Sequence, residues 1–217
     1  MHHSAFFHST PLLAGAPLPD GSPVSFKLEF LQPSGSFKDR GIGHMIQTLV
    51  DAGNVSRLIC SSGGNAGHAV ATAAQKLGLP ADVFVPSTTL PLMREKIAAR
   101  GANVIVSGAN WNEADAEARR KLAADPGARY IPPFDDPLIW QGNSTLIDEL
   151  VASCTADTLP SVIVLSVGGG GLLRGVQLGL ERHGLSDRVT VVRCEIPAFC
   201  TGEFGIASEY SHTCTCF

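Results

Sequence analysis

The sequence lacks several features that mark special classes of protein. No apolar run approaches the ~20 residues that a membrane-spanning helix needs. The first 17 residues contain neither Lys nor Arg, and His and Pro interrupt their apolar stretches, which argues against a secretory signal. With 16 basic and 20 acidic side chains, the net charge of −4 gives no electrostatic footprint for nucleic acid. We therefore predict a cytoplasmic protein without a membrane or nucleic-acid partner.

The sequence also lacks a disulfide framework of the kind that is spread through small secreted chains. Of its six cysteines, only Cys60 and Cys154 lie in the body, and the other four fall in the last 24 residues. This distribution is typical of an intracellular, reduced protein. At 44% hydrophobic and 17% charged residues, the 217-residue chain is not disordered and suffices for one domain or two small lobes.

Short β-branched runs alternate with helical patterns along the chain. Glycines end several of the expected helices, and the strands are too uniformly apolar for a half-exposed antiparallel sheet. This order predicts an α/β fold in which parallel sheets are flanked by helices. The expected strands cover residues 24–30, 57–60, 82–85, 103–106, 129–131, 162–167 and 189–195. The expected helices cover residues 38–52, 65–77, 90–99, 112–124, 138–152 and 172–183.

Three strand-to-helix turns carry unusual residues, and the ligands of open α/β sheets lie at this end of the strands. The first turn is residues 33–41 (PSGSFKDRG). Lys38 falls in the first turn of the expected helix, where the positive N-terminal end favours a neutral amine. A neutral amine is the form that bonds covalently to an aldehyde. The alternative for a lone lysine is an exposed surface position.

The second turn, residues 61–67 (SSGGNAG), follows the expected strand 57–60. Its backbone N–H groups at a helix start predict a nest for an anion, here a carboxylate. Asn65 could hydrogen-bond a ligand or could only cap the helix.

The third turn, residues 166–173 (SVGGGGLL), has four consecutive glycines at a helix start. Such a row of N–H donors suits a phosphate. No Gly-Lys-Ser/Thr follows, and the third glycine of a dinucleotide fingerprint would fall on Arg174, so neither of those motifs is present. An amine, a carboxylate nest and a phosphate nest together fit pyridoxal phosphate with an amino-acid substrate.

In order and spacing, residues 34–41, 62–67 and 168–173 resemble the fold-type II pyridoxal-phosphate enzymes, most of all the L-serine dehydratases and their serine dehydratase-like relatives. Residues 132–140 (PPFDDPLIW) are similar to those relatives too. The resemblance covers about residues 26–195 and implies a two-lobed fold like that of tryptophan synthase β. It implies a larger lobe, left incomplete here, from residues 1–38 and 135–195, and a smaller lobe from residues 39–134.

The resemblance also implies roles for individual residues. Lys38 would bond to the aldehyde of pyridoxal 5′-phosphate and later move the Cα proton of the substrate. Phe37 would pack against the pyridine ring, and Asn65 would hydrogen-bond the ring's 3′ oxygen. The implied substrate-binding residues are Ser62, Gly63, Asn65 and Ala66. The implied phosphate-binding residues are Gly168, Gly169, Gly170, Gly171 and Leu172, with Glu195 near the cofactor.

The activity implied by the resemblance is the β-elimination of L-serine to pyruvate and ammonia, with L-threonine as a further substrate and a homodimer as the family's assembly. Serine racemases resemble this pattern but have a serine where this chain has Gly63. Lacking that second acid/base, the site is expected to eliminate and not to racemise. The alternatives are another enzyme of the same cofactor group, a threonine dehydratase or a β-replacement synthase, and a non-catalytic partner of a full-length subunit.

The end of the sequence departs from the family pattern after about Glu195. Residues 196–217 show no helical or strand period, so we expect an irregular tail outside the family pattern and impaired activity in this chain. Zinc binding through His212, Cys214 and Cys216, with Cys200, is a rival interpretation of the tail. Because Cys-x-Cys is tighter than the usual ligand spacing, no metal site is predicted.

Overall fold

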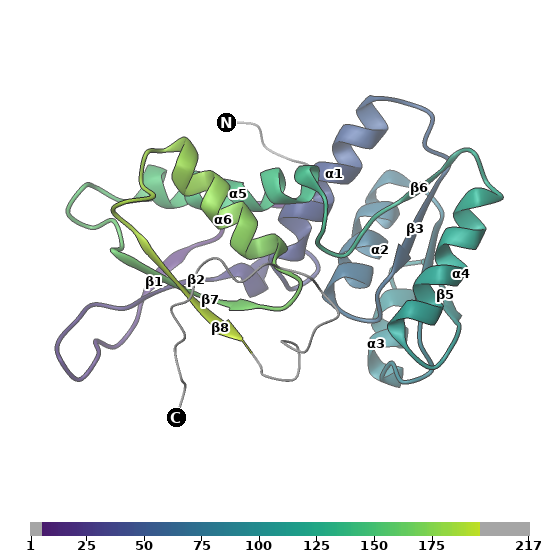
Figure 1. Cartoon of the computed structure of the whole chain (residues 1–217), viewed down its shortest axis with the longest axis horizontal. Coiled ribbons are helices and arrows are strands. Elements are labelled where there is room, and N and C mark those ends of the chain that lie inside the picture. Colours follow the sequence, from purple (N-terminus) through teal and green to yellow (C-terminus); the bar gives the residue numbers. More distant parts are fainter. Residues whose placement is uncertain (1–5, 196–217) are drawn as a thin grey trace. The chain divides into compact units, whose positions relative to one another are not determined.

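The computed structural model describes residues 6–195, and the chain divides into two compact units between Pro133 and Phe134. The first unit is built around a four-stranded parallel sheet in the order β5-β4-β3-β6 (Figure 1). Its strands are β3 (Arg57–Ser61), β4 (Ala81–Val85), β5 (Asn103–Val106) and β6 (Ala128–Tyr130). Its helices are α1 (Lys38–Asp51), α2 (Asn65–Leu77), α3 (Pro91–Ala98) and α4 (Trp111–Ala123).

Helices cover both faces of this sheet, as a buried parallel sheet requires. On one face, Ile59 and Phe84 from the strands form a buried apolar cluster with Ala114 and Ala118 of α4. On the other face lie α2 and, packed against it, α1 (Figure 1). Because β3 and β4 are almost wholly buried, the turns that follow them are held on a rigid base.

An antiparallel hairpin precedes the parallel sheet. It pairs β1 (Leu12–Ala14) with β2 (Ser25–Lys27), and a 3-10 turn, η1 (Glu29–Leu31), follows. The expected strand 24–30 is therefore wrong in length, and its antiparallel partner was not expected. After Lys27 the Glu29 carboxylate accepts two 2.7 Å hydrogen bonds from the fully buried guanidinium of Arg40, which holds the chain in the turn.

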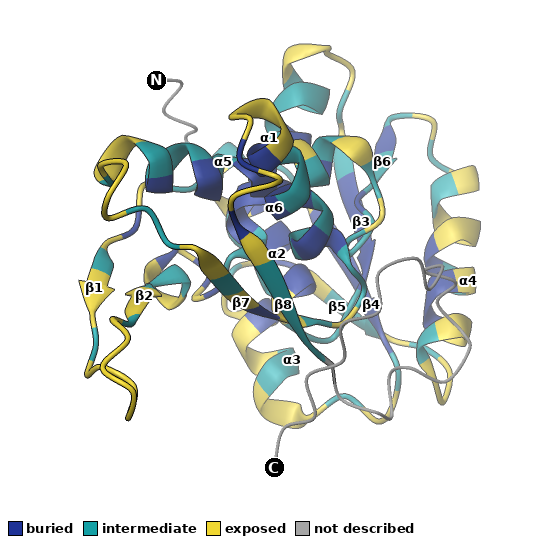
Figure 2. Ribbon diagram, turned by 60° about the vertical axis from the view of Figure 1, so that its left-hand side comes forward, coloured by how far each residue is buried: buried dark blue, intermediate teal, exposed yellow. Residues whose placement is uncertain are grey.

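The second unit contains a parallel pair of strands, β7 (Val162–Val167) and β8 (Thr190–Glu195), and two helices, α5 (Pro137–Ser153) and α6 (Gly171–Arg182). Asp136 caps α5 by accepting a hydrogen bond from the Leu138 amide at 2.8 Å, with Pro137 at the first helical position. The helices α5 and α6 approach closely at Gly175 and Gly179 of α6, where an added Cβ would clash with α5. Figure 2 shows that β7 keeps an exposed face, where Val164 is 64% exposed.

The predicted fold class is confirmed: the chain is α/β, with parallel sheets flanked by helices. The helix at 65–77 and the strands at 103–106 and 162–167 have the expected bounds, and most other elements differ from expectation by one or two residues. The assignment of residues 1–38 and 135–195 to one lobe, residues 39–134 to another and residues 196–217 to an irregular tail stays a prediction. Within residues 6–195, no helix combines the length and apolarity that spanning a membrane takes.

Candidate active site

Lys38 is the first residue of α1 and is partly buried, so the alternative of an exposed surface lysine is wrong. Its Nζ donates a hydrogen bond to the Pro133 carbonyl oxygen at 2.5 Å and lies 5.2 Å from the centroid of the Phe37 ring. Burial lowers the pKa of the Lys38 amine to about 8. Burial therefore shifts the pKa in the direction that the sequence suggested, toward the neutral amine.

The turn before Lys38 is fixed by polar contacts to α1 and α2. The Ser34 amide donates to Asp39 Oδ2 at 2.6 Å, and the Ser34 carbonyl oxygen lies 2.9 Å from His68 Nδ1. The hydroxyls of Ser34 and Ser36 are buried and have no hydrogen-bond partner among the described residues. Buried hydroxyls normally find a partner, so both remain available to a polar ligand group beside Lys38.

The second predicted turn links β3 to α2. Gly64 is the N-cap residue, no side chain caps α2, and Asn65 is an exposed first helical residue. The alternative that Asn65 only caps the helix is therefore wrong. The N–H groups in the first turn of a helix have no intrahelical partners, so this uncapped start can bind an anion. Ser62 and Gly63 are partly buried and Ala66 is buried.

At two glycines of this turn, neighbouring atoms lie too close to leave room for a side chain. A Cβ on Gly67 would lie 2.0 Å from the Ser62 carbonyl oxygen, so only glycine fits there. A Cβ on Gly63 would lie 2.4 Å from Thr89 Oγ1. Thr89, in the loop after β4, therefore packs on the predicted carboxylate-binding turn. Sequence reasoning missed it, because a threonine in a polar loop carries no distinguishing signal.

The tetraglycine turn, Gly168 to Gly171, lies between β7 and α6. Gly170 is the N-cap residue of α6, with a φ of +79° and no capping side chain, and Leu172 follows in the first helical turn. A Cβ on Gly169 would lie 2.3 Å from Phe134 Cδ1, whereas one on Gly168 would meet nothing within 4 Å. The turn thus rests on Phe134, whose carbonyl accepts a 3.0 Å hydrogen bond from the Trp140 indole. Sequence reasoning also missed Phe134 as the support of this turn.

The remaining predicted residues lie at the end of the described range, residues 6–195, or outside it. Glu195 is the last residue of β8, and its side chain is outside the described part. The rival zinc ligands, Cys200, His212, Cys214 and Cys216, lie outside the described residues.

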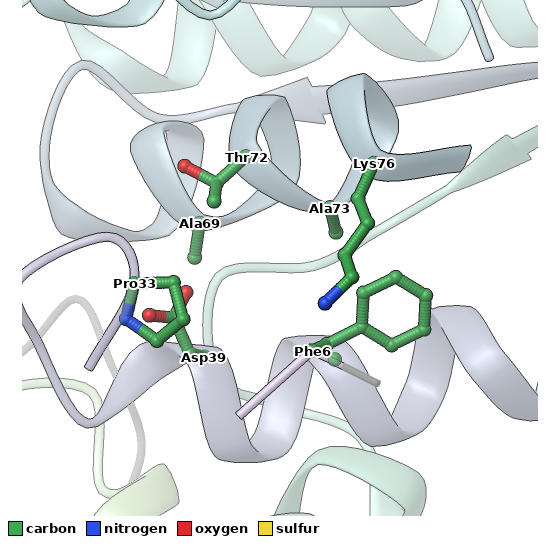
Figure 3. A pocket seen from close by; sticks show the side chains of 8 residues that line it. Phe6, Pro33, Asp39, Ala69, Thr72, Ala73 and Lys76 are labelled. Carbon is green, nitrogen blue, oxygen red and sulfur yellow. The ribbon is translucent and has the colours of Figure 1, made fainter. Parts of the chain in front are cut away.

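A separate pocket lies between α1, α2 and the N-terminal segment (Figure 3). Pro33 and Asp39 lie at one end, and Lys76 and Phe6 at the other. Its lining includes none of the predicted cofactor-binding or substrate-binding residues. Burial raises the pKa of Asp39, whose carboxylate is already occupied by the Ser34 amide.

Comparison with known proteins identifies the family. Residues 4–211 match the family described as pyridoxal-phosphate dependent enzyme, and the chain belongs to this family. The match is wider than residues 26–195, over which the motifs carried the resemblance, and it extends past Glu195. The fold-type II resemblance is thereby confirmed.

Individual members of the family show which of its enzymes the chain is similar to. The chain is 48% identical over 177 residues to the human serine dehydratase-like protein and 43% identical over 208 residues to the catabolic L-serine/threonine dehydratase of Saccharomyces cerevisiae. These alignments cover 81% and 88% of this chain but only 53% and 58% of the relatives. Among solved structures, a fungal L-serine ammonia-lyase from Rhizomucor miehei matches with a TM-score of 0.79 and 36% identity. That match covers 88% of this chain and 61% of the fungal chain.

The described residues offer groups that suit the aldehyde and the phosphate of the family's cofactor and the carboxylate of an amino-acid substrate. An amine whose pKa is about 8 suits the aldehyde, and the unpartnered hydroxyls of Ser34 and Ser36 lie in the same turn. The uncapped, glycine-rich start of α6 suits the phosphate. The uncapped start of α2 suits the carboxylate of an amino acid.

Proposed function

We propose that this chain uses pyridoxal 5′-phosphate to convert L-serine to pyruvate and ammonia, and that L-threonine is a second substrate. The observation that carries the proposal is Lys38: a partly buried amine with a pKa of about 8, in the turn whose sequence matches the family. The names of the yeast, human and fungal relatives support the substrate. The chain spans little more than half the length of the curated relatives, and we therefore propose their activity for it.

Each motif has a role in the proposed reaction. Lys38 holds the cofactor and then acts as the base at the substrate's Cα, and Phe37 packs on the cofactor ring. Asn65 bonds the ring's 3′ oxygen. The carboxylate is held by Ser62, Gly63, Asn65 and Ala66. The phosphate is held by Gly168, Gly169, Gly170, Gly171 and Leu172, and Glu195 lies near the cofactor.

When bound, the cofactor supplies an electron sink that stabilises the carbanion formed at Cα. Lys38 Nζ, released when the substrate amine takes its place, would accept the Cα proton. The electron pair of that C–H bond would expel the β-hydroxyl, which would take up a proton from the solvent and leave as water, and Lys38 would return its proton to the solvent. The enamine that is released hydrolyses in water to pyruvate and ammonia. The lowered pKa of Lys38 suits this base, because proton transfer is most effective when the pKa lies near the working pH.

The proposed reaction has a base on one face of the substrate only. Gly63 carries no side chain, and Thr89 packs where a side chain at position 63 would extend. We therefore expect elimination without formation of D-serine. A cytoplasmic location and a homodimeric assembly are part of the same proposal, from the family resemblance.

The test is the visible absorbance of the protein with added cofactor, followed by a pyruvate assay with L-serine. Lys38→Ala should lose the absorbance band and lower pyruvate formation by at least about 10²-fold, the usual contribution of a general base. Lys121→Ala, at an exposed position on α4, is the matched control and should behave like the unmodified chain. A band without pyruvate would reject the activity but not the cofactor, and pyruvate formation by Lys38→Ala would reject the site.

A further inference from the structure

A buried polar network lies directly behind the carboxylate-binding turn. Ser61, the last residue of β3, is fully buried, and its hydroxyl donates to Asp115 Oδ1 of α4 at 2.6 Å. The Tyr130 hydroxyl, at the end of β6, donates to the same oxygen. Arg119 Nε donates to Asp115 Oδ2 at 2.7 Å, and the Trp111 indole donates to the Ser61 carbonyl oxygen at 2.8 Å. Side chains of α4 and β6 thus fix the end of β3.

The negative charge of Asp115, at the centre of this network, is balanced by Arg119. Burial of Asp115 raises its pKa, but hydrogen bonds from Ser61, Tyr130 and Arg119 outweigh burial and lower the pKa overall. The carboxylate is therefore ionised. The Arg119 guanidinium pairs with it and lies 4.5 Å from the centroid of the Tyr130 ring. This pairing reduces the repulsion that a bare Asp115 would exert on an anion at the adjacent turn.

The network acts on the turn because Ser61 is covalently joined to Ser62. On its other side, the Ser62 carbonyl oxygen is confined by Gly67, where any Cβ would lie only 2.0 Å away. The backbone of Ser62 is therefore clamped between α4, through Ser61, and the first turn of α2. The N–H groups of an anion nest are effective only when their directions are fixed in advance.

We infer that Asp115 and Arg119 are positioning residues for the carboxylate-binding turn, acting through Ser61 on the backbone N–H groups that follow it. The inference rests on the proposed function, since it assigns these residues to the recognition of the substrate carboxylate. Neither residue is required to touch substrate or cofactor.

The test separates carboxylate recognition from cofactor binding. Pyridoxal 5′-phosphate is titrated first, and glycine, an amino acid with no β-leaving group, is then titrated into the loaded protein and followed by absorbance. Asp115→Asn should raise the glycine concentration at half-saturation by about tenfold, since small misplacements of binding groups are costly, and should change that of the cofactor by less than about twofold. Ser61→Ala should have the same effect.

The matched control is Glu117→Gln, which removes an ion pair with Arg120 on the same helix. It should change neither titration. Asp115 is proposed to act on the turn through Ser61. The double variant, Asp115→Asn with Ser61→Ala, should therefore bind glycine no more weakly than either single variant. Additive losses, an unchanged glycine titration, or an equal loss of cofactor binding would each overturn the inference.

A second measurement does not depend on the cofactor. In the protein without pyridoxal phosphate, Asp115→Asn should speed hydrogen exchange of the amides of residues 62–66, and Glu117→Gln should not. If the unmodified chain fails to bind the cofactor, the proposed function fails while this measurement still decides whether the network positions the turn. Unchanged exchange at residues 62–66 would overturn the inference.

Discussion

Lys38 is the residue on which the proposed chemistry depends. Its amine is partly buried, it donates to the Pro133 carbonyl, and its pKa is about 8 instead of the ordinary 10.5. A lysine with this pKa is substantially neutral in mildly alkaline solution, where an exposed lysine is almost fully charged. Such an amine can both attack an aldehyde and accept a proton.

The pKa of Lys38 predicts how its reactivity changes with pH. Trace acetic anhydride labels only neutral amines, so labelling of Lys38 should rise to half its maximum near pH 8. The cause is burial, which disfavours the charged form in the folded protein. Mass spectrometry of the digested protein gives the labelling of each lysine, with unfolded protein as the reference. A half-maximum near pH 10.5 in the folded protein would contradict the assigned environment.

At the scale of residues, the sequence identified candidate functional groups but not the side chains that support them. Lys38 is partly buried and Asn65 does not cap its helix, and the roles of both residues stay predictions. Thr89 and Asp115 were not predicted, because their contacts with the turn after β3 join residues far apart in the chain. Local pattern identifies a turn but does not show which distant side chain packs on it.

At the scale of elements, the alternation of strands and helices was predictable because each period is local. Strand β5 and helix α2 have the expected bounds, the latter ending at Gly78 in the left-handed conformation that glycine adopts readily. The hairpin of β1 and β2 was not predicted. Its strands are only three residues each, and the turn after Lys27 depends on the buried Arg40, which the local sequence does not reveal.

The packing between two elements predicts the cost of adding a side chain to the turn before α2. Gly63→Ala should lower the free energy of unfolding by about 1–3 kcal/mol, because Thr89 must move. Thr89→Ala removes the two nearest atoms, so Gly63→Ala should cost clearly less in that background. Urea unfolding of the four proteins measures both costs.

Gly64→Ala is the matched control for this cycle. A Cβ on Gly64 would meet nothing within 4 Å, so the cost of Gly64→Ala should be the same with and without Thr89→Ala. Equal costs of Gly63→Ala with and without Thr89→Ala would show that the two residues do not pack together.

At the scale of the whole molecule, the predicted site residues divide between the two compact units. Lys38 and the carboxylate-binding turn belong to the first unit, and the tetraglycine turn belongs to the second. The sequence instead assigned Lys38 and the tetraglycine turn to one lobe and residues 39–134 to another, and that assignment stays a prediction. The family match over residues 4–211 places both sets of motifs in one enzyme family.

The central claim is that one pyridoxal phosphate joins Lys38 and has its phosphate held by the tetraglycine turn. The most direct test is borohydride reduction at limiting cofactor, followed by mass spectrometry. The reduced cofactor should be found on Lys38, and Gly168→Asp should lower its amount by about tenfold, since the new charge repels the phosphate in a space that holds no other atom within 4 Å. Ser186→Asp, beyond the other end of α6, should not lower the amount of adduct on Lys38. Labelling of Lys38 by pyridoxal, which has no phosphate, should be the same in Gly168→Asp and the unmodified chain. Absence of the adduct, an adduct on another lysine, or equal labelling of Gly168→Asp and the unmodified chain would contradict the account.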